Sequence, residues 1–263
     1  MYAFSYTSPA TLDDAVQAVQ AGGQPLAGGQ TLLGSLKLRL AAPEQLVDLR
    51  ALTELTGIRP QGDTLVVGAM TRHAEVAESA EIAHAIPALA RLAAGIGDKQ
   101  VRAMGTLGGS LANNDPAADY PAAVLGLGAT VRTHTREIAA DNYFQGLFAT
   151  ALEPGELITA VHFPIPRQAA YVKFVQPASL FALIGVFVAR FDNGVRVAVT
   201  GAGNGVLRHT AMEQALAHDF RPDAIADIGT DAAEMSADIH ASSAYRAHLV
   251  GVMARRAVAQ ALA

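Results

Sequence analysis

The sequence predicts an α+β fold in which helices are set on mainly antiparallel strands. Helical and strand-like segments follow one another along the chain, an Asp-Asn-Gly turn at residues 192–194 joins two β-branched runs, and an amphipathic helix closes the sequence. The chain has 263 residues, of which 51% are hydrophobic and 16% charged. That length and composition can bury a large core, in one large domain or in two to three small ones.

The first 57 residues predict a small unit of β–α–β type. Thr11 is placed to cap its first helix, and Gly22 and Gly23 are placed to end that helix. A second helix is expected to carry Leu33, Leu36 and Leu40 on one side. The expected elements are a helix at 11–23, a brief strand at 25–29, a helix at 31–40 and a strand at 44–49.

The middle of the chain predicts strands on either side of a helical stretch. Pro87 is expected to break that stretch, because proline has no amide hydrogen to donate and clashes with the preceding turn. The expected elements are a strand at 63–71, helices over 72–97, an apolar run that ends in a strand over 121–135, and a strand at 155–166.

The last block predicts a strand at 170–176, a hairpin around the Asp-Asn-Gly turn, and a helical pattern from Leu207 to the end. Its clearest amphipathic helix covers residues 242–263. We therefore expect three parts, with boundaries near residues 57 and 168: residues 1–57, 58–168 and 169–263.

Charge and composition exclude several classes of function. The net charge is −5 and there is no run of Lys or Arg, which argues against nucleic acid or an anionic membrane as a partner. No apolar segment is long enough to span a membrane, and the first residues do not resemble a secretory signal, so we expect a cytoplasmic protein. The chain has no cysteine, and it can therefore form no disulfide and ligate no iron–sulfur cluster with its own thiolates.

Two glycine-rich turns stand out, "AGGQT" at 27–31 and "GTLGGS" at 105–110. Glycine allows a ligand to approach the backbone closely, and a turn that leads into a helix offers free amides to an anion such as phosphate. Asp119 could accept a hydrogen bond from a ribose or an adenine. Neither turn fits G-x-G-x-x-G or the P-loop pattern. The pattern alone therefore leaves two hypotheses open, ordinary tight turns or a site for a phosphate-bearing ligand.

Several segments resemble the FAD-binding medium subunit of the molybdenum hydroxylases. This is the family of xanthine dehydrogenase and carbon monoxide dehydrogenase, and the bacterial carbon monoxide dehydrogenase type is the nearer match. The resemblance is carried by "AGGQTLLGSLKLRLAAPEQLVDL" and "IGDKQVRAMGTLGGSLANNDPAADYPAA", and it continues in order through "VGAMTRHAEV", "ALEPGELITAVHFP", "AYVKF" and "VAVTGAG". It implies two subdomains that clasp FAD and a C-terminal three-stranded antiparallel sheet with helices.

The resemblance also implies which residues bind FAD, without a covalent link. Both turns would hold the pyrophosphate, Asp119 would lie near the ribose and adenine, and Ile96, Leu157 or Ile158, and Lys173 would complete the set. The residues implied in the two turns are Ala27, Gly28, Gly29, Gln30, Thr31, Leu32, Leu33 and Gly34, and Thr106, Leu107, Gly108, Gly109 and Ser110.

This chain departs from the family pattern at three places, one of which is the segment "VRTHTREIAADNYF", trimmed relative to the family's usual strand pair. Gln30 stands where many relatives have Thr or His, and "VQPASLFALIG" after Lys173 replaces a basic and acidic stretch. Two further cations, Lys37 and Arg39, allow two interpretations: a solvated helix face, or a position near the flavin or on a subunit surface. No residue is expected to act as a catalytic base or nucleophile, and the eight histidines have no metal-ligand spacing such as H-E-x-x-H.

The resemblance implies an electron-transfer subunit of an oxidoreductase complex. A large partner subunit would hold the molybdenum cofactor and a small one the 2Fe–2S clusters, assembled as a dimer of heterotrimers. Electrons would pass from the clusters through FAD to an external acceptor. Two alternatives remain open at this stage, a flavin-less docking subunit of the same complex and a stand-alone flavin oxidoreductase.

Overall fold

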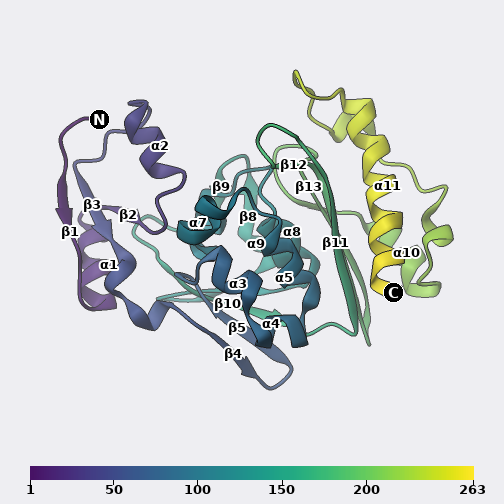
Figure 1. The fold of residues 1–263 in the computed structure, drawn as a ribbon, viewed down its shortest axis with the longest axis horizontal. Coiled ribbons are helices and arrows are strands. Elements are labelled where there is room, and N and C mark those ends of the chain that lie inside the picture. Colours follow the sequence, from purple (N-terminus) through teal and green to yellow (C-terminus); the bar gives the residue numbers. More distant parts are fainter.

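The computed structural model describes all residues, 1–263, as mixed helix and sheet. Figure 1 shows the chain running from the unit of β1 to β3 at one end, through a central sheet with helices, to the sheet of β11 to β13 and helix α11 at the other end. The predicted α+β class is confirmed. No helix is long and apolar enough to cross a lipid bilayer.

The N-terminal unit is a three-stranded parallel sheet in the order β1-β3-β2, with α1 packed on it. Thr11 caps α1 as predicted, because its side chain accepts a hydrogen bond from the amide of Asp14. The bounds are β1 Ser5–Thr7, α1 Leu12–Gln20, β2 Gln24–Leu26, α2 Leu32–Lys37 and β3 Gln45–Asp48.

Helix α2 is shorter than the predicted helix at 31–40. It ends at Lys37, and Arg39 then takes a left-handed conformation with φ of 59°. Because the chain leaves the helix there, Leu40 is 77% exposed, while Leu36 is buried. Leu33, at 37% exposed, does not share the buried side either, so the prediction of one packed leucine face is wrong.

The central sheet is antiparallel, in the order β4-β5-β10-β6-β7, and helices cover one of its faces. The predicted break at Pro87 is confirmed, since Pro87 opens α5, and a second break falls at Ser79, which caps α4. The bounds are β4 Ile58–Gln61, β5 Thr64–Gly68, α3 His73–Glu78, α4 Ala80–Ala85, α5 Pro87–Ala94, α6 Lys99–Met104, α7 Leu107–Asn113, α8 Tyr120–Gly126, β6 Thr130–Thr133, β7 Glu137–Ala139, α9 Ala140–Tyr143, β8 Phe144–Gly146, β9 Ala149–Thr150 and β10 Ile158–Pro164.

The C-terminal sheet has four strands, in the order β11-β12-β13-β14, so the expectation of three strands is wrong. The fourth strand arises because Leu207 and Arg208 pair with Val199 and Ala198, in a region predicted to be helical. The predicted hairpin is confirmed as β12–β13. The bounds are β11 Gln168–Val175, β12 Ala182–Phe191, β13 Gly194–Thr200, β14 Leu207–Arg208, α10 Thr210–His218 and α11 Ser243–Leu262.

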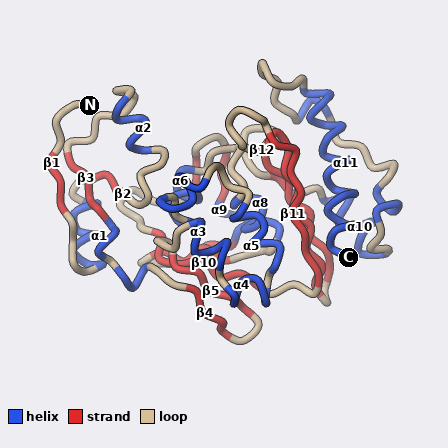
Figure 2. The backbone as a smooth tube through the Cα atoms, in the orientation of Figure 1, coloured by secondary structure: helices blue, strands red, loops and turns tan.

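Two large hydrophobic cores lie on opposite faces of the C-terminal sheet. One fills the space between the central sheet, its helices and residues such as Phe187, and the other lies between strands β11 to β13 and helices α10 and α11. Figure 2 shows the sheet of β11 and β12 standing between the central helices and α11. Because Phe187 and Ala198 belong to the central core, the last part of the chain is packed firmly against the middle part.

Candidate functional site

The first glycine turn offers a row of unused hydrogen-bond donors. The backbone amides of residues 28–32 donate to no acceptor within the protein, and the hydroxyl of Thr31 forms no hydrogen bond. Gly29 adopts a positive φ of 72°, which bends the chain so that successive amides are left open. A run of free amides of this kind favours an anion.

The second turn lies directly against the first. A Cβ atom at Gly28 would overlap the carbonyl oxygen of Met104 and come within 2.8 Å of Cα of Gly105. A Cβ at Gly109 would lie 3.6 Å from Cβ of Ala27. The structure therefore brings together the two turns that lie almost 80 residues apart in the sequence (about 78, from Gly28 to Thr106).

The second turn differs from its predicted form, because the amides of residues 107–110 already donate within the protein. The amides of Leu107 and Gly108 donate to the carbonyls of Thr71 and Ala69 at 3.0 and 2.8 Å, and those of Gly109 and Ser110 donate to Thr106. A Cβ at Gly108 would lie 2.7 Å from Cβ of Ala69. The glycines here allow α7 to pack closely on the end of β5, and the Ser110 hydroxyl is left without a protein partner.

His73 supports the second turn from behind. Its amide donates to the carbonyl of Gly105 at 2.9 Å, and its ring, 5% exposed, leaves no space for a side chain at Gly105. Burial, with a smaller contribution from the nearby Arg102, lowers the pKa of His73 to about 4. The imidazole is therefore neutral near pH 7, and a positive charge is not buried behind the turn.

Ile96 lies at the far end of the segment that leads into the second turn. The guanidinium of Arg102 donates to the carbonyls of Ile96 and Gly97 at 3.1 and 3.0 Å, which closes a loop at residues 96–102. Asp98 caps α6 through the amide of Val101 at 2.8 Å. These contacts order the charged run of residues 98–102 and fix Ile96 relative to the turn.

Asp119 and Lys173 form a buried ion pair beside Ile96. The Lys173 ammonium lies 3.1 Å from the Asp119 carboxylate, and their side chains are 9% and 4% exposed. Lys173 also donates to the carbonyls of Gly95 and Leu180, so all three of its protons are used, and the Tyr171 hydroxyl donates to Asp119 at 2.5 Å. Burial raises the pKa of Asp119, and Lys173 and Tyr171 oppose that shift.

The segment that follows Lys173, residues 175–185, is ordered by its own contacts. The side-chain oxygen of Gln176 accepts hydrogen bonds from the amides of Ala178 and Ser179, both at 2.7 Å. The segment borders a cavity of about 280 Å³ that Asp115 and Arg246 also line. The carbonyl of Leu180 in this segment accepts from the Lys173 ammonium at 3.0 Å, which anchors the segment to Lys173.

Leu157 and Ile158 lie where β10 begins, beside the second turn. Their side chains are 4% and 7% exposed and pack into the protein's own cores. The amide of Leu157 donates to Nδ1 of His134 at 3.2 Å, and the amide of His134 donates back to the carbonyl of Leu157 at 3.0 Å. What these residues can offer a ligand is mainly backbone.

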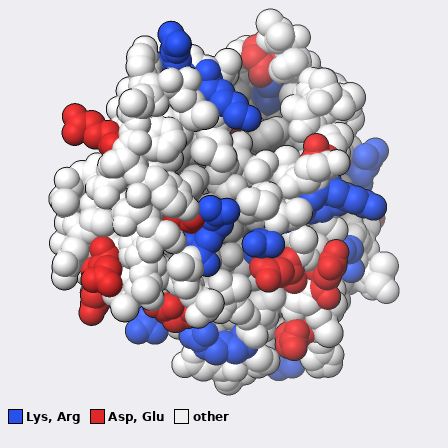
Figure 3. Space-filling view, turned by 60° about the vertical axis from the view of Figure 1, so that its left-hand side comes forward, with Lys and Arg blue, Asp and Glu red and all other residues white.

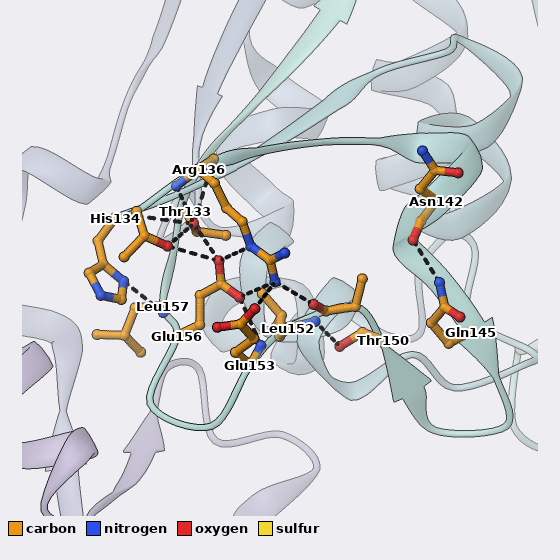
Figure 4. A network of polar contacts seen from close by, with 12 residues as sticks. Thr133, His134, Arg136, Asn142, Gln145, Thr150, Leu152, Glu153, Glu156 and Leu157 are labelled. Carbon is orange, nitrogen blue, oxygen red and sulfur yellow. Dashed lines mark hydrogen bonds and ion pairs between the residues drawn. The ribbon is translucent and has the colours of Figure 1, made fainter.

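A polar network holds the loop that precedes Leu157 (Figure 4). Glu156 accepts from the guanidinium of Arg136 at 2.8 and 2.9 Å and from the hydroxyls of Thr133 and Thr135 at 2.7 and 3.1 Å. These bonds, led by that of Arg136, lower the pKa of Glu156 to about 2. The network ties the turn after β6 to the start of β10.

Replacing Glu156 by Gln is expected to lower the free energy of unfolding by about 1–3 kcal/mol at pH 7, because charge-assisted hydrogen bonds are lost. The folded pKa lies below the ordinary value of 4.5, so the carboxylate stabilises the fold above pH 4.5 and loses that effect as the pH falls toward 2. Thermal unfolding from pH 7 to pH 3 checks this: the difference between wild type and variant should shrink with acid. A difference that grew with acid would contradict it.

No group of three or more His, Asp or Glu side chains lies close enough to hold a metal ion. Figure 3 shows small separate groups of Lys and Arg and of Asp and Glu on one face, with wide uncharged areas between them. Free amides and hydroxyls at the meeting of two turns fit a pyrophosphate, which is what a flavin dinucleotide would present.

The fold and the paired turns thus fit the class of proteins that hold a phosphate-bearing cofactor by backbone amides. The chain belongs to the family described as the FAD binding domain in molybdopterin dehydrogenase, and the match covers residues 2–166.

Its similarity to characterised relatives extends over the whole chain. It is 36% identical to the carbon monoxide dehydrogenase medium chain of Afipia carboxidovorans, over 99% of this chain and 97% of that one. It is 33% identical to the nicotine 6-hydroxylase medium subunit of Paenarthrobacter nicotinovorans, over 98% and 97%. Among solved structures, the reconstituted CO dehydrogenase from Oligotropha carboxidovorans matches with a TM-score of 0.90 at 34% identity, over 99% of this chain and 98% of that one.

The protein is therefore an FAD-binding medium subunit of a molybdenum hydroxylase complex, and a component of an oxidoreductase. The molybdenum cofactor and the 2Fe–2S clusters fit the other subunits of such a complex, in keeping with a chain that contains no cysteine.

Sequence reasoning missed two supporting residues, Tyr171 and His73. Tyr171 had a usable signal, since it lies two residues before Lys173 and so on the same face of β11. His73 had none, because its role depends on the backbone carbonyl of Gly105, which the fold brings to it.

Proposed function

We propose that this chain carries electrons from 2Fe–2S clusters on a partner subunit, through FAD, to an external acceptor. The observation that supports this most is the row of free amides at residues 28–32, held against the second glycine turn. When bound, FAD supplies the ability to accept electrons and pass them on. The chain itself contributes binding, orientation and exclusion of water.

Each part of the site has a proposed role in holding the cofactor. The amides of residues 28–32 and the hydroxyls of Thr31 and Ser110 donate to the pyrophosphate. The turn at 106–110 gives that donor row a rigid wall, while the backbone at Ile96 and at 157–158 borders the flavin. Asp119 and Lys173 hold the borders of the site together. Lys173 offers no free donor to a ligand, because its ammonium already donates three hydrogen bonds within the protein.

The same proposal covers assembly, location and domain organisation. We propose a heterotrimer with a large and a small subunit, paired as a dimer of heterotrimers in the cytoplasm. The relatives named above are medium chains of comparable length, which supports a chain that works with partners. Boundaries at residues 57 and 168 remain our proposal for the three parts of the chain.

Electron transfer can be tested with the purified complex. The complex is first partly reduced with dithionite and then mixed with a quinone. We expect the quinone to oxidise the complex at a rate that falls at least about tenfold when FAD is removed and returns when FAD is added back. Visible absorbance of the flavin reports occupancy. An unchanged rate without FAD would instead support a flavin-less docking subunit.

A further inference from the structure

A turn of residues 176–181, which joins β11 to β12, is closed by one side chain. The side-chain oxygen of Gln176 accepts from the amides of Ala178 and Ser179, both at 2.7 Å, and from the Ser179 hydroxyl at 3.1 Å. The amide of Leu180 donates to the carbonyl of Gln176 at 2.9 Å. Three donors of the 176–181 turn therefore depend on a single side-chain oxygen.

The turn holds Leu180 in a conformation that its residue type disfavours. Leu180 has a φ of 62°, in the left-handed region that glycine adopts without strain. In this conformation its carbonyl accepts from the Lys173 ammonium at 3.0 Å. A strained residue of this kind persists only where its surroundings hold it, and here they are the contacts of Gln176 and the bond to Lys173.

Of the three hydrogen bonds that Lys173 donates, only the bond to Leu180 depends on the turn. The other two go to the carboxylate of Asp119 at 3.1 Å and to the carbonyl of Gly95 at 2.8 Å. These acceptors lie at the start of α8 and at the end of α5, both in the central part of the chain. Opening of the turn would therefore free one proton of Lys173 and leave its ion pair with Asp119 in place.

A free proton on Lys173 would change the electrostatics next to Ile96. Reduction adds negative charge to a flavin, and hydrogen bonds between a cation and a negative group are the stronger kind. The 176–181 turn contributes no charged side chain of its own. What the turn controls is whether the Lys173 ammonium has a proton to offer.

We propose that Gln176 is a positioning residue for electron transfer. Through the 176–181 turn, it keeps the third proton of Lys173 on the carbonyl of Leu180 and so holds the reduction potential of bound FAD low. The proposal rests on the proposed function, in which the backbone at Ile96 borders the flavin. Lys173 donates to the carbonyl of Gly95, the residue before Ile96, so its ammonium lies at that border.

The test is a redox titration of the complete complex, with its FAD and all its subunits, as wild type and as Gln176→Met. Methionine has a similar length but lacks the oxygen, so the turn opens and Lys173 gains a free proton. Reduced FAD should then bind at least about tenfold more tightly relative to oxidised FAD. For a two-electron couple, this raises the midpoint potential by about 30 mV or more. Flavin absorbance follows the titration, and FAD content should stay as in wild type.

Three control variants separate this effect from general damage to the fold. Gln176→Glu keeps the accepting oxygen and, like Gln176→Met, loses the side-chain amide that lies 3.4 Å from Nδ1 of His240, so it should show no rise in potential. Leu180→Gly relieves the left-handed strain and keeps the carbonyl, so it should leave the potential unchanged without lowering the melting temperature. In a Lys173→Met background, Gln176→Met should no longer shift the potential.

Two results would overturn the proposal. One is a midpoint potential in Gln176→Met that equals or lies below that of wild type. The other is the same rise in the Lys173→Met background, which would mean that the turn acts through another group. A wild-type complex without FAD, or with FAD that accepts no electrons, would contradict the proposed function itself, and it would be seen before any variant is compared.

Discussion

Replacing Lys173 by Met is expected to lower the free energy of unfolding by about 3–5 kcal/mol near neutral pH, the usual cost of removing one partner of a buried ion pair. The Asp119 carboxylate, 4% exposed, would keep only the Tyr171 hydroxyl as a partner. The carbonyls of Gly95 and Leu180 would lose their donor at the same time. Thermal and urea unfolding of the purified medium chain measure the loss.

The pH dependence of this variant gives a sharper readout. Without Lys173, burial raises the pKa of Asp119 further above its ordinary 3.8, so the neutral carboxyl becomes the favoured buried form. Stability gained by protonation is complete below pH 3.8 and is lost as the pH rises through the folded pKa. The deficit of Lys173→Met should therefore be largest at pH 7–8 (roughly neutral) and shrink toward pH 4.

A double variant serves as the control. Combining Lys173→Met with Asp119→Asn removes both charges, and we expect it to regain about 1–3 kcal/mol of the loss at neutral pH. A Lys173→Met protein within about 1 kcal/mol of wild type, with no gain from Asp119→Asn, would mean that the pair contributes little.

Local signals in the sequence were sufficient where the structure depends on neighbours along the chain. The cap at Thr11, the start of α5 at Pro87 and the Asp-Asn-Gly hairpin are all set within a few residues, and each was predicted correctly. Strand β14 was missed because its two residues become a strand only by pairing with β13. The end of α2 was missed because Arg39 takes a conformation that its residue type disfavours.

The candidate site likewise has parts that the sequence predicts and parts that only the fold reveals. The two turns could be recognised from their glycines, but not which of them keeps its amides free, since that depends on Thr71 and Ala69 meeting the second turn. Asp119 and Lys173 lie 54 residues apart, and spacing gives no sign that they form an ion pair. Direct contact of either residue with FAD stays a prediction.

The second large effect is expected from Gly28→Ala, through the contact between the two turns. A methyl group at residue 28 overlaps the carbonyl oxygen of Met104, which is backbone and cannot swing aside, so the turns must separate. Overpacking of this kind costs about 1–3 kcal/mol. The free amides are then no longer held against the second turn, so we expect FAD affinity to drop about 10- to 100-fold and the melting temperature to fall as well.

Titration of FAD into the apoprotein, followed by flavin fluorescence, measures the affinity of the Gly28→Ala variant. Gly251→Ala is the matched control, because the same methyl group enters open space on α11, and it should bind FAD as wild type does. Wild-type affinity in Gly28→Ala would show that the turns can separate without consequence, and that the cofactor does not depend on their contact. A loss confined to Gly28→Ala would instead locate pyrophosphate binding where the free amides meet the second turn.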